Sequence, residues 1–185
     1  MSSDRIVTPY EGSGAAVWDP DAPIPAPLEP HRTPVRPEWV DYNGHMSESC
    51  YLLVFGDSSD AFFRYLGIDE AYRAGGHSLF TVETHLHNVR EAAEGEPLRL
   101  RLQVLDHDAK WLHIFHEMRH GDTDALLATA EQLLVHVDTE AGRSAAMPDD
   151  LLRRVAAVAR AHAALPMPDV VGRPMGIRRP PEGRS

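Results

Sequence analysis

The chain has 185 residues, and its 28 acidic residues outnumber its 18 basic ones, which gives a net charge of −10. This length suits one domain with a sizeable core, because domains commonly contain roughly 100–200 residues. The acidic excess argues against nucleic acid and anionic membranes as partners, since both attract basic patches. No segment approaches the ~20 consecutive apolar residues of a membrane span, and the N-terminus has no apolar stretch of signal-peptide length. We therefore expect a cytoplasmic protein.

The single cysteine, Cys50, excludes an internal disulfide and fits a reducing compartment. It lies in an apolar run without an activating base nearby, so we interpret it as part of the core rather than as a nucleophile. Lys110 is the only lysine, and arginine therefore carries almost all of the positive charge. Arginine is the better residue for forked contacts with phosphate or carboxylate.

The first 30 residues contain six prolines with scattered glycine and serine, a composition that cannot sustain a helix or a central strand. We expect an arm that is either mobile or laid over the surface. Residues 31–38 can be extended, but Pro34 and Pro37 would each remove a donor from a strand ladder. This segment supports at most a short edge strand.

The next segment, WVDYNGHM at residues 39–46, places candidate site residues directly before a long apolar run. These residues are Asp41, Asn43, Gly44 and His45. The first backbone N–H groups of a helix lack intrahelical partners and carry positive partial charge, so they can stabilise an oxyanion. A carboxylate beside them can activate water or attack directly. The alternative is a turn in which Asp41 and Asn43 bond their own backbone.

Residues 46–66 predict a helix that is apolar over most of its circumference and is therefore wrapped by other elements. Three of its charged side chains, Asp57, Asp60 and Arg64, share one narrow arc with Gly56 at 100° per residue. Gly67 supplies the C-terminal stop.

Alternation with a period of two then predicts four strands. The alternating segments are residues 80–87, 98–104, 111–119 and 127–137. Their connections have hairpin length and carry turn residues, at 91–97, 106–110 and 121–124. We therefore expect a meander of antiparallel strands after one buried helix. Residues 125–134 also fit a helix, but the flanking hairpin signals favour a strand.

Pro148 followed by two aspartates begins a second amphipathic helix, which runs to about His162. The tail from Pro166 is rich in proline, glycine and arginine, and we expect it to be loosely held.

Eleven histidines invite a metal site, above all His113, His116 and His120. In a strand, however, His113 and His116 point to opposite faces, and we expect no metal site. The chain also lacks the Gly-x-Ser-x-Gly elbow, a P-loop, a dinucleotide fingerprint and a plausible Cys/His pair. A hydrolase built from this chain must therefore use carboxylates without a serine triad or metal.

A central helix wrapped by a five-stranded antiparallel sheet, with an acid in the turn before the helix, resembles the hotdog fold, the α+β fold of acyl-CoA thioesterases. The most similar branch is that of 4-hydroxybenzoyl-CoA thioesterase. Its catalytic loop has the form Asp-x-x-Gly followed by a hydrophobic residue or His, and residues 41–45 read DYNGH. The resemblance covers roughly residues 31–140. Together with the composition of the flanking segments, it divides the chain into a Pro-rich arm (1–30), the hotdog domain (31–140), a C-terminal helix (141–165) and a Pro/Arg-rich tail (166–185).

More narrowly, four phrases resemble the betainyl-CoA thioesterases of carnitine and betaine catabolism, which occur alone or fused behind L-carnitine dehydrogenase. The phrases are WVDYNGHM, YLLVFGDSSDAFFRYLGID, SLFTVETHLHNVREAAEGEPL, and LHIFHEMRHG with LLVHVDT. The resemblance implies hydrolysis of a short-chain acyl-CoA, most of all betainyl-CoA, with no cofactor because coenzyme A is part of the substrate. It also implies a homodimer with joined sheets, and the alternation of residues 98–104 is compatible with edge pairing.

Carried over residue by residue, the family's nucleophile or general base toward the thioester carbonyl is Asp41. The family's oxyanion donor, a backbone N–H in the first helical turn, falls near Glu48. Asn43 and Gly44 complete the loop motif, and His45 either orients Asp41 or packs.

The phosphates of coenzyme A need arginine or lysine at the mouth of the site. Arg90, Lys110 and Arg119 lie at or near strand ends where loops are expected to converge, although each also fits a solvated surface charge. A pocket for the quaternary ammonium of betaine needs aromatic faces and a carboxylate, for which Glu48 is the candidate. The candidate aromatics are Trp39, Tyr42, Tyr51 and Trp111, each of which also fits a core or surface position.

Two alternatives stay open. Hydratases of the same fold use a loop of the form Asp-x-Asn-Pro-x-His, and residues 41–45 are one residue short and lack the proline. The chain also fits a non-catalytic acyl-CoA-binding protein, although the retained Asp41 argues against it.

Overall fold

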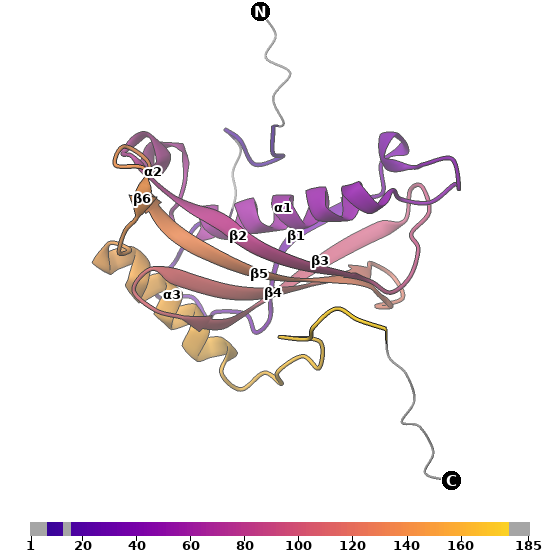
Figure 1. Cartoon of the computed structure of the whole chain (residues 1–185). Coiled ribbons are helices and arrows are strands. Elements are labelled where there is room, and N and C mark those ends of the chain that lie inside the picture. The colour runs from indigo at the N-terminus through magenta and orange to yellow at the C-terminus, as the bar shows by residue number, and fades with distance from the viewer. Residues whose placement is uncertain (1–6, 13–15, 178–185) are drawn as a thin grey trace, which may run out of the picture.

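A computed structural model describes residues 7–12 and 16–177 (Figure 1). It shows one curved antiparallel sheet with a long helix, α1 (Glu48–Tyr65), across its concave face. The strands are β1 (Leu28–Pro34), β2 (His77–Asn88), β3 (Pro97–His107), β4 (Trp111–His120), β5 (Leu126–Asp138) and β6 (Arg143–Ser144). The order across the sheet is β1-β3-β4-β5-β2, and β6 pairs with β5. This arrangement confirms the predicted α+β hotdog fold.

Helix α1 begins two residues later than its apolar pattern predicts, because Ser47 at its N-cap has extended dihedrals of φ −62° and ψ 144°. It ends at Tyr65, one residue before the predicted end, with Leu66 as the C-cap. Gly67 adopts φ +93°, a conformation that glycine reaches without steric cost. The N–H of Ile68 then bonds the Phe63 carbonyl at 2.8 Å, which closes the last turn.

The core lies between α1 and the concave face of the sheet. The apolar residues of β3 point inward and are almost fully buried, among them Leu98, Leu100 and Leu102, whereas the arginines between them are only partly buried. Phe55 and Phe62 of α1 pack against this face from above. The alternating apolar residues of the strands and the apolar surface of the helix therefore pack against each other in one interface.

The predicted meander is wrong at one connection. Strand β2 pairs with β5, and β3 pairs with β1 and β4, so residues 89–96 cross from one side of the sheet to the other instead of forming a hairpin. This crossing segment is tied to other loops: Met46 donates to the Ala92 carbonyl at 2.8 Å, and Val35 donates to the Glu96 carbonyl at 2.9 Å. Turn residues predict where the chain bends, but they do not predict which strand pairs with the strand that follows.

The predicted edge pairing of residues 98–104 is also wrong, because β3 lies between β1 and β4. Its alternation reflects a sheet with one buried face and one outer face. Along the main path of the sheet, the strands at the two ends are β1 and β2. The expected short edge strand before the Asp41 turn is therefore β1, which begins three residues earlier than the predicted segment.

The second predicted helix is α3 (Asp149–His162), which buries Leu151, Val155 and Val158 beside β3. It also closes the end of α1, because the Arg154 guanidinium donates to the Leu66 carbonyl at 3.0 Å. The sequence patterns did not indicate three short elements, the 3-10 helix η1 (Pro37–Trp39), helix α2 (Glu70–Ala74) and strand β6.

The arm that precedes β1 lies over the charged arc of α1. Thr8 donates to Asp60 at 2.6 Å, and the Trp18 ring lies 5.4 Å from that of Tyr65. Arg64 is buried and bonds Asp60 at 2.9 Å as well as Glu70 of α2 at 2.7 Å. Of the two placements expected for the arm, the described part is laid over the surface.

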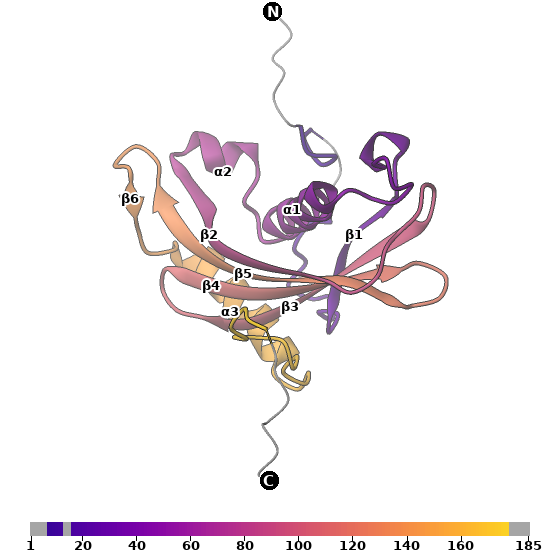
Figure 2. The same cartoon turned by 45° about the vertical axis from the view of Figure 1, so that its right-hand side comes forward.

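The C-terminal tail crosses the outer face of the sheet, on the side opposite α1 (Figures 1 and 2). Gln103 donates to the Pro166 carbonyl at 3.4 Å, and the Gly172 N–H donates to Glu131 at 2.9 Å. The tail is therefore attached at two points of the sheet within the described chain. None of the described helices is long and apolar enough to cross a membrane.

Candidate active site

The loop that contains Asp41 is a tight turn. The Gly44 N–H donates to the Asp41 carbonyl, and the Asp41 N–H donates to the His45 carbonyl, both at 3.0 Å. Gly44 has φ +79°, which favours glycine at this position. One carboxylate oxygen of Asp41, Oδ1, accepts from the Asn43 N–H at 2.8 Å. The other oxygen accepts no hydrogen bond from the residues that the structure describes, and the side chain is only partly buried.

The base of this loop is firmly held. Ser47 donates to the Trp39 carbonyl and Met46 to the Ala92 carbonyl, both at 2.8 Å. Trp39 and Met46 are themselves buried in the core. Asp41 is therefore presented on a rigid support directly before α1.

The N-terminus of α1 offers free donors. In the described chain the side chain of the N-cap residue Ser47 makes no capping hydrogen bond, and Glu48 and Ser49 precede the first intrahelical bonds. Their N–H groups thus retain bonding capacity at the positive end of a helix of 18 residues. The loop thus supplies a carboxylate and the first turn of the helix that follows supplies open N–H donors, which are the two kinds of group that acyl transfer needs.

A family model described as "Thioesterase-like superfamily" matches residues 35–155. The chain belongs to this superfamily. It is 47% identical over 151 residues to a betainyl-CoA thioesterase from Pseudomonas aeruginosa, an alignment that covers 81% of this chain and 95% of that protein. These matches confirm the prediction of a hotdog-fold acyl-CoA thioesterase.

A second relative is a fused L-carnitine dehydrogenase/betainyl-CoA thioesterase from Rhizobium sp., which is 46% identical over 153 residues. The alignment covers 83% of this chain, and the chain spans only 31% of that relative's length. Among solved structures, a putative thioesterase from Pseudomonas putida KT2440 superposes with a TM-score of 0.73 at 30% identity, covering 83% of this chain and 98% of that one.

In this thioesterase, His45 does not bond Asp41 through its imidazole. Its Nδ1 lies 3.4 Å from a carboxylate oxygen of Glu91, while its backbone carbonyl accepts the Asp41 N–H. His45 also forms a bridge with Ala93. Any effect of His45 on the orientation of Asp41 therefore passes through the backbone.

The three basic residues expected at the mouth of the site do not converge. Arg90 follows β2 near the Asp41 loop and is exposed. Arg119 is paired with Glu117 at 2.8 Å and donates to the Asp124 carbonyl at 2.7 Å. Lys110 lies in the turn between β3 and β4, at the opposite end of the sheet. The expectation that their loops meet is wrong for Lys110, because strand ends alternate between the two ends of an antiparallel sheet.

The four candidate aromatics also separate. Trp39 is 6% exposed, and the Arg36 guanidinium lies 5.0 Å from the centre of its ring. Tyr51 is 4% exposed, and its hydroxyl donates to the Arg90 carbonyl at 3.3 Å. Tyr42 is 97% exposed beside Asp41, whereas Trp111 begins β4 at the far end of the sheet. Of these four, only Tyr42 combines an open ring with a position next to Asp41.

A buried polar network under the middle of α1 was not predicted. The Ser58 and Ser59 hydroxyls lie 3.3 Å from the two ring nitrogens of His116, one on each. Ser59 also donates to the Gln132 side chain at 2.9 Å, and Gln132 donates to Thr84 at 3.5 Å. Complete burial lowers the pKa of His116 to about 4, so the ring is neutral near pH 7. The sequence did contain a sign of this buried network: two adjacent serines lie on the apolar face of the helix, and polar residues occupy strand positions that point inward.

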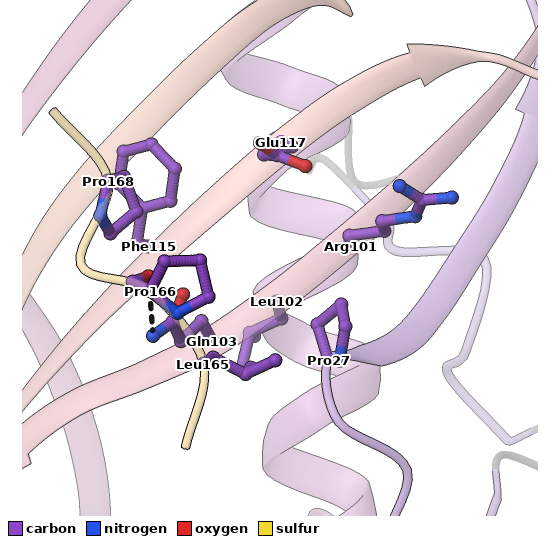
Figure 3. Close-up of a pocket in the computed structure, with 9 residues that line it drawn as sticks. All are labelled: Pro27, Arg101, Leu102, Gln103, Phe115, Glu117, Leu165, Pro166 and Pro168. Atoms are coloured by element: carbon purple, nitrogen blue, oxygen red, sulfur yellow. Dashed lines mark hydrogen bonds between the residues drawn. The ribbon is translucent and has the colours of Figure 1, made fainter. Parts of the chain in front are cut away.

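Two cavities differ in their relation to the site. The smaller one, of about 240 Å³, lies on the outer face of the sheet beneath the proline-rich start of the tail (Figure 3). Its charged side chains are already paired, Arg101 with Asp124 at 2.8 Å and Glu117 with Arg119 at 2.8 Å. The larger one, of about 570 Å³, includes Glu48 at the start of α1. The larger cavity is therefore the one connected to the candidate active site.

Proposed function

We propose that this thioesterase hydrolyses betainyl-CoA to betaine and coenzyme A, as a step of carnitine catabolism. The observation that carries the proposal is the 47% identity to a betainyl-CoA thioesterase along 95% of that relative's length. The Asp41 loop and the open N-terminus of α1 supply the groups that this hydrolysis needs.

The chemistry can follow either of two routes from the same geometry. As a nucleophile, the free oxygen of Asp41 attacks the thioester carbonyl, the C–S bond breaks, and water then hydrolyses the mixed anhydride. As a general base, Asp41 takes a proton from a water that attacks the carbonyl, and the thiolate of coenzyme A leaves. In both routes the carbonyl oxygen gains negative charge, which the N–H groups near Glu48 stabilise.

The acyl group of the proposed substrate carries a quaternary ammonium, which cannot donate a hydrogen bond or lose its charge. Such a group is recognised by aromatic faces and carboxylates. Tyr42 offers an open ring next to Asp41, and Glu48 offers a carboxylate at the helix start. Trp39 and Tyr51 support this site from the core. The Trp39 ring lies under the Arg36 guanidinium, and the Tyr51 hydroxyl already donates to the Arg90 carbonyl.

The proposed active form is a homodimer joined through β2. Strand β2 has a free edge, and two of its apolar side chains are strongly exposed, Phe80 at 53% and Val82 at 56%. Pairing two copies along the first half of this edge would cover both side chains and leave the second half of β2, which lines the larger cavity, open. Sedimentation should give a dimer, and Val82→Glu should shift it toward monomer. A stable, fully active wild-type monomer at micromolar concentration would contradict the proposal.

The proposed reaction is tested by a thiol-release screen over short acyl-CoAs that includes betainyl-CoA and an enoyl-CoA. A thioesterase releases free thiol from saturated acyl-CoAs, whereas a hydratase adds water to the enoyl group and releases none. We expect the highest kcat/KM for betainyl-CoA. The absence of thiol release from every substrate by the folded protein would end the proposal.

A further inference from the structure

The larger cavity is a groove that starts at α1 on the concave face, passes around the second half of the end strand β2 and reaches the C-terminal tail on the outer face. Its walls come from Glu48, from the second half of β2, from the outer faces of β4 and β5, and from tail residues 170–176. Side chains such as Leu86, Phe115 and Met175 give it apolar surface, and Thr84 and Thr129 give it hydroxyls. Its volume of about 570 Å³ falls within the range of small-molecule sites.

Arg173 is the only lining residue with a permanent positive charge. The arginines of the neighbouring strands are committed to carboxylates, as Arg99 is to Glu29 at 2.8 Å and Arg101 is to Asp124 at 2.8 Å. Arg173, in contrast, forms no ion pair within the part of the chain that the structure describes, and it is half-buried. A half-buried, unpaired guanidinium in a groove is poised for an anion.

The position of Arg173 is fixed by a tight turn in the tail. The Val171 N–H donates to the Pro168 carbonyl at 3.0 Å, and Gly172 adopts φ +66°. The Gly172 N–H then donates to one oxygen of Glu131 at 2.9 Å, while the other oxygen lies 2.8 Å from His113. Glu131 thus anchors the tail one residue before Arg173.

We propose that Arg173 binds a phosphate of the coenzyme A portion of the substrate, with the thioester at the Glu48 end of the groove. This inference rests on the proposed function, because it places the same acyl-CoA in the same site. It assigns the phosphate contact to a tail that lies outside residues 35–155, the part that the superfamily model matches.

The test compares Arg173→Ala with Arg160→Ala, a control that removes one exposed positive charge from α3 outside the groove. Each protein is assayed with betainyl-CoA and with betainyl-pantetheine, which keeps the thioester but lacks phosphate. We expect Arg173→Ala to raise KM for betainyl-CoA about 10-fold or more with little change in kcat, since a charge-assisted contact is lost. KM for the pantetheine thioester should not change, and Arg173→Lys should recover part of the loss. An unchanged KM, or an equal rise in the Arg160→Ala control, would overturn the assignment.

A second variant tests the anchor. Glu131→Ala removes a negative charge from the groove, which by electrostatics alone would favour the anionic substrate and lower KM. If Glu131 holds the tail, KM for betainyl-CoA should rise instead, and a lower KM would contradict the anchoring role. Calorimetric binding of free coenzyme A to wild type and Arg173→Ala gives an answer even when no substrate turns over. The proposed reaction and the proposed phosphate contact can therefore fail separately.

Discussion

Two polar regions of the molecule depend on α1, and they are used in opposite ways. The Asp41 loop precedes the helix and is open to solvent, with one carboxylate oxygen left without a partner in the described chain. The His116 network lies about three turns further along and is enclosed, with both ring nitrogens facing serine hydroxyls. In the first region the carboxylate and the N–H groups of the helix N-terminus keep open hydrogen-bonding positions, whereas in the second the hydroxyls and the imidazole bond one another. We infer that the first region serves the substrate and the second serves stability.

The largest expected effect comes from removing the charge of Asp41. Asp41→Asn keeps the size of the side chain and its bond from Asn43, so the fold should remain. Hydrolysis should fall by a factor on the order of 10² or more, because the amide is neither a nucleophile nor a base. Thiol release under saturating betainyl-CoA measures this loss.

The matched control is Asp108→Asn. Asp108 also accepts backbone N–H groups of its own turn, those of Lys110 and Trp111 at 2.7 Å, but it lies at the opposite end of the sheet. It should keep near-normal kcat. A comparable loss in both variants would mean that turn geometry, not the carboxylate at position 41, controls the rate.

The next effect concerns stability and pH. Burial lowers the pKa of His116 from 6.5 to about 4, so the unfolded chain binds a proton more readily than the native one. Its contribution to stability is therefore complete above pH 6.5 and is lost as the pH falls toward 4, by about 2 kcal/mol between pH 7 and pH 5. Urea unfolding at both pH values should show this loss in the wild type and not in His116→Gln.

The comparison with His116→Gln is necessary because Asp57 changes the pH dependence of stability in the opposite direction. Burial raises the pKa of Asp57 to about 6, and a raised carboxyl pKa lowers stability as the pH rises from about 4 to 6. Its contribution is common to both proteins and cancels in the difference. An identical pH dependence of wild type and His116→Gln would contradict the role given to the network.

A smaller effect is expected at the acyl end of the open region. Tyr42→Leu removes the exposed ring beside Asp41, and a cation–π contact contributes roughly 0.5–2 kcal/mol. The value of kcat/KM for betainyl-CoA should fall about 2- to 30-fold, and much less for the uncharged 3,3-dimethylbutyryl-CoA. Equal losses on both substrates would show that the ring contributes shape alone.

The elements of the fold were largely readable from the sequence, because they depend on local periodicity. Alternation located β2 to β5, near-continuous apolarity located α1, and Pro148 with two aspartates located the start of α3. The sheet order was not readable. Alternation says which side of a strand is buried, but nothing in it distinguishes a hairpin at residues 91–97 from a crossing.

The site residues, too, separate into those that the sequence could predict and those that depend on the sheet order. The Asp41 loop and the start of the helix are contiguous in sequence, so their proximity followed from the order of residues. Lys110 was assigned to the phosphates and Trp111 to the quaternary ammonium from residue type and from their place at the start of a strand, and the topology places both at the far end of the sheet. The groove with Arg173 and the His116 network join residues far apart in the chain, which periodicity cannot bring together.

The division of labour between the two regions is tested most directly by measuring kcat for Asp41→Asn and His116→Gln in one thiol-release assay at pH 7, corrected for the folded fraction of each protein. We predict a loss of about 10²-fold or more for Asp41→Asn and less than about threefold for His116→Gln. Near-normal turnover by folded Asp41→Asn, or an equal loss in both variants, would contradict the account.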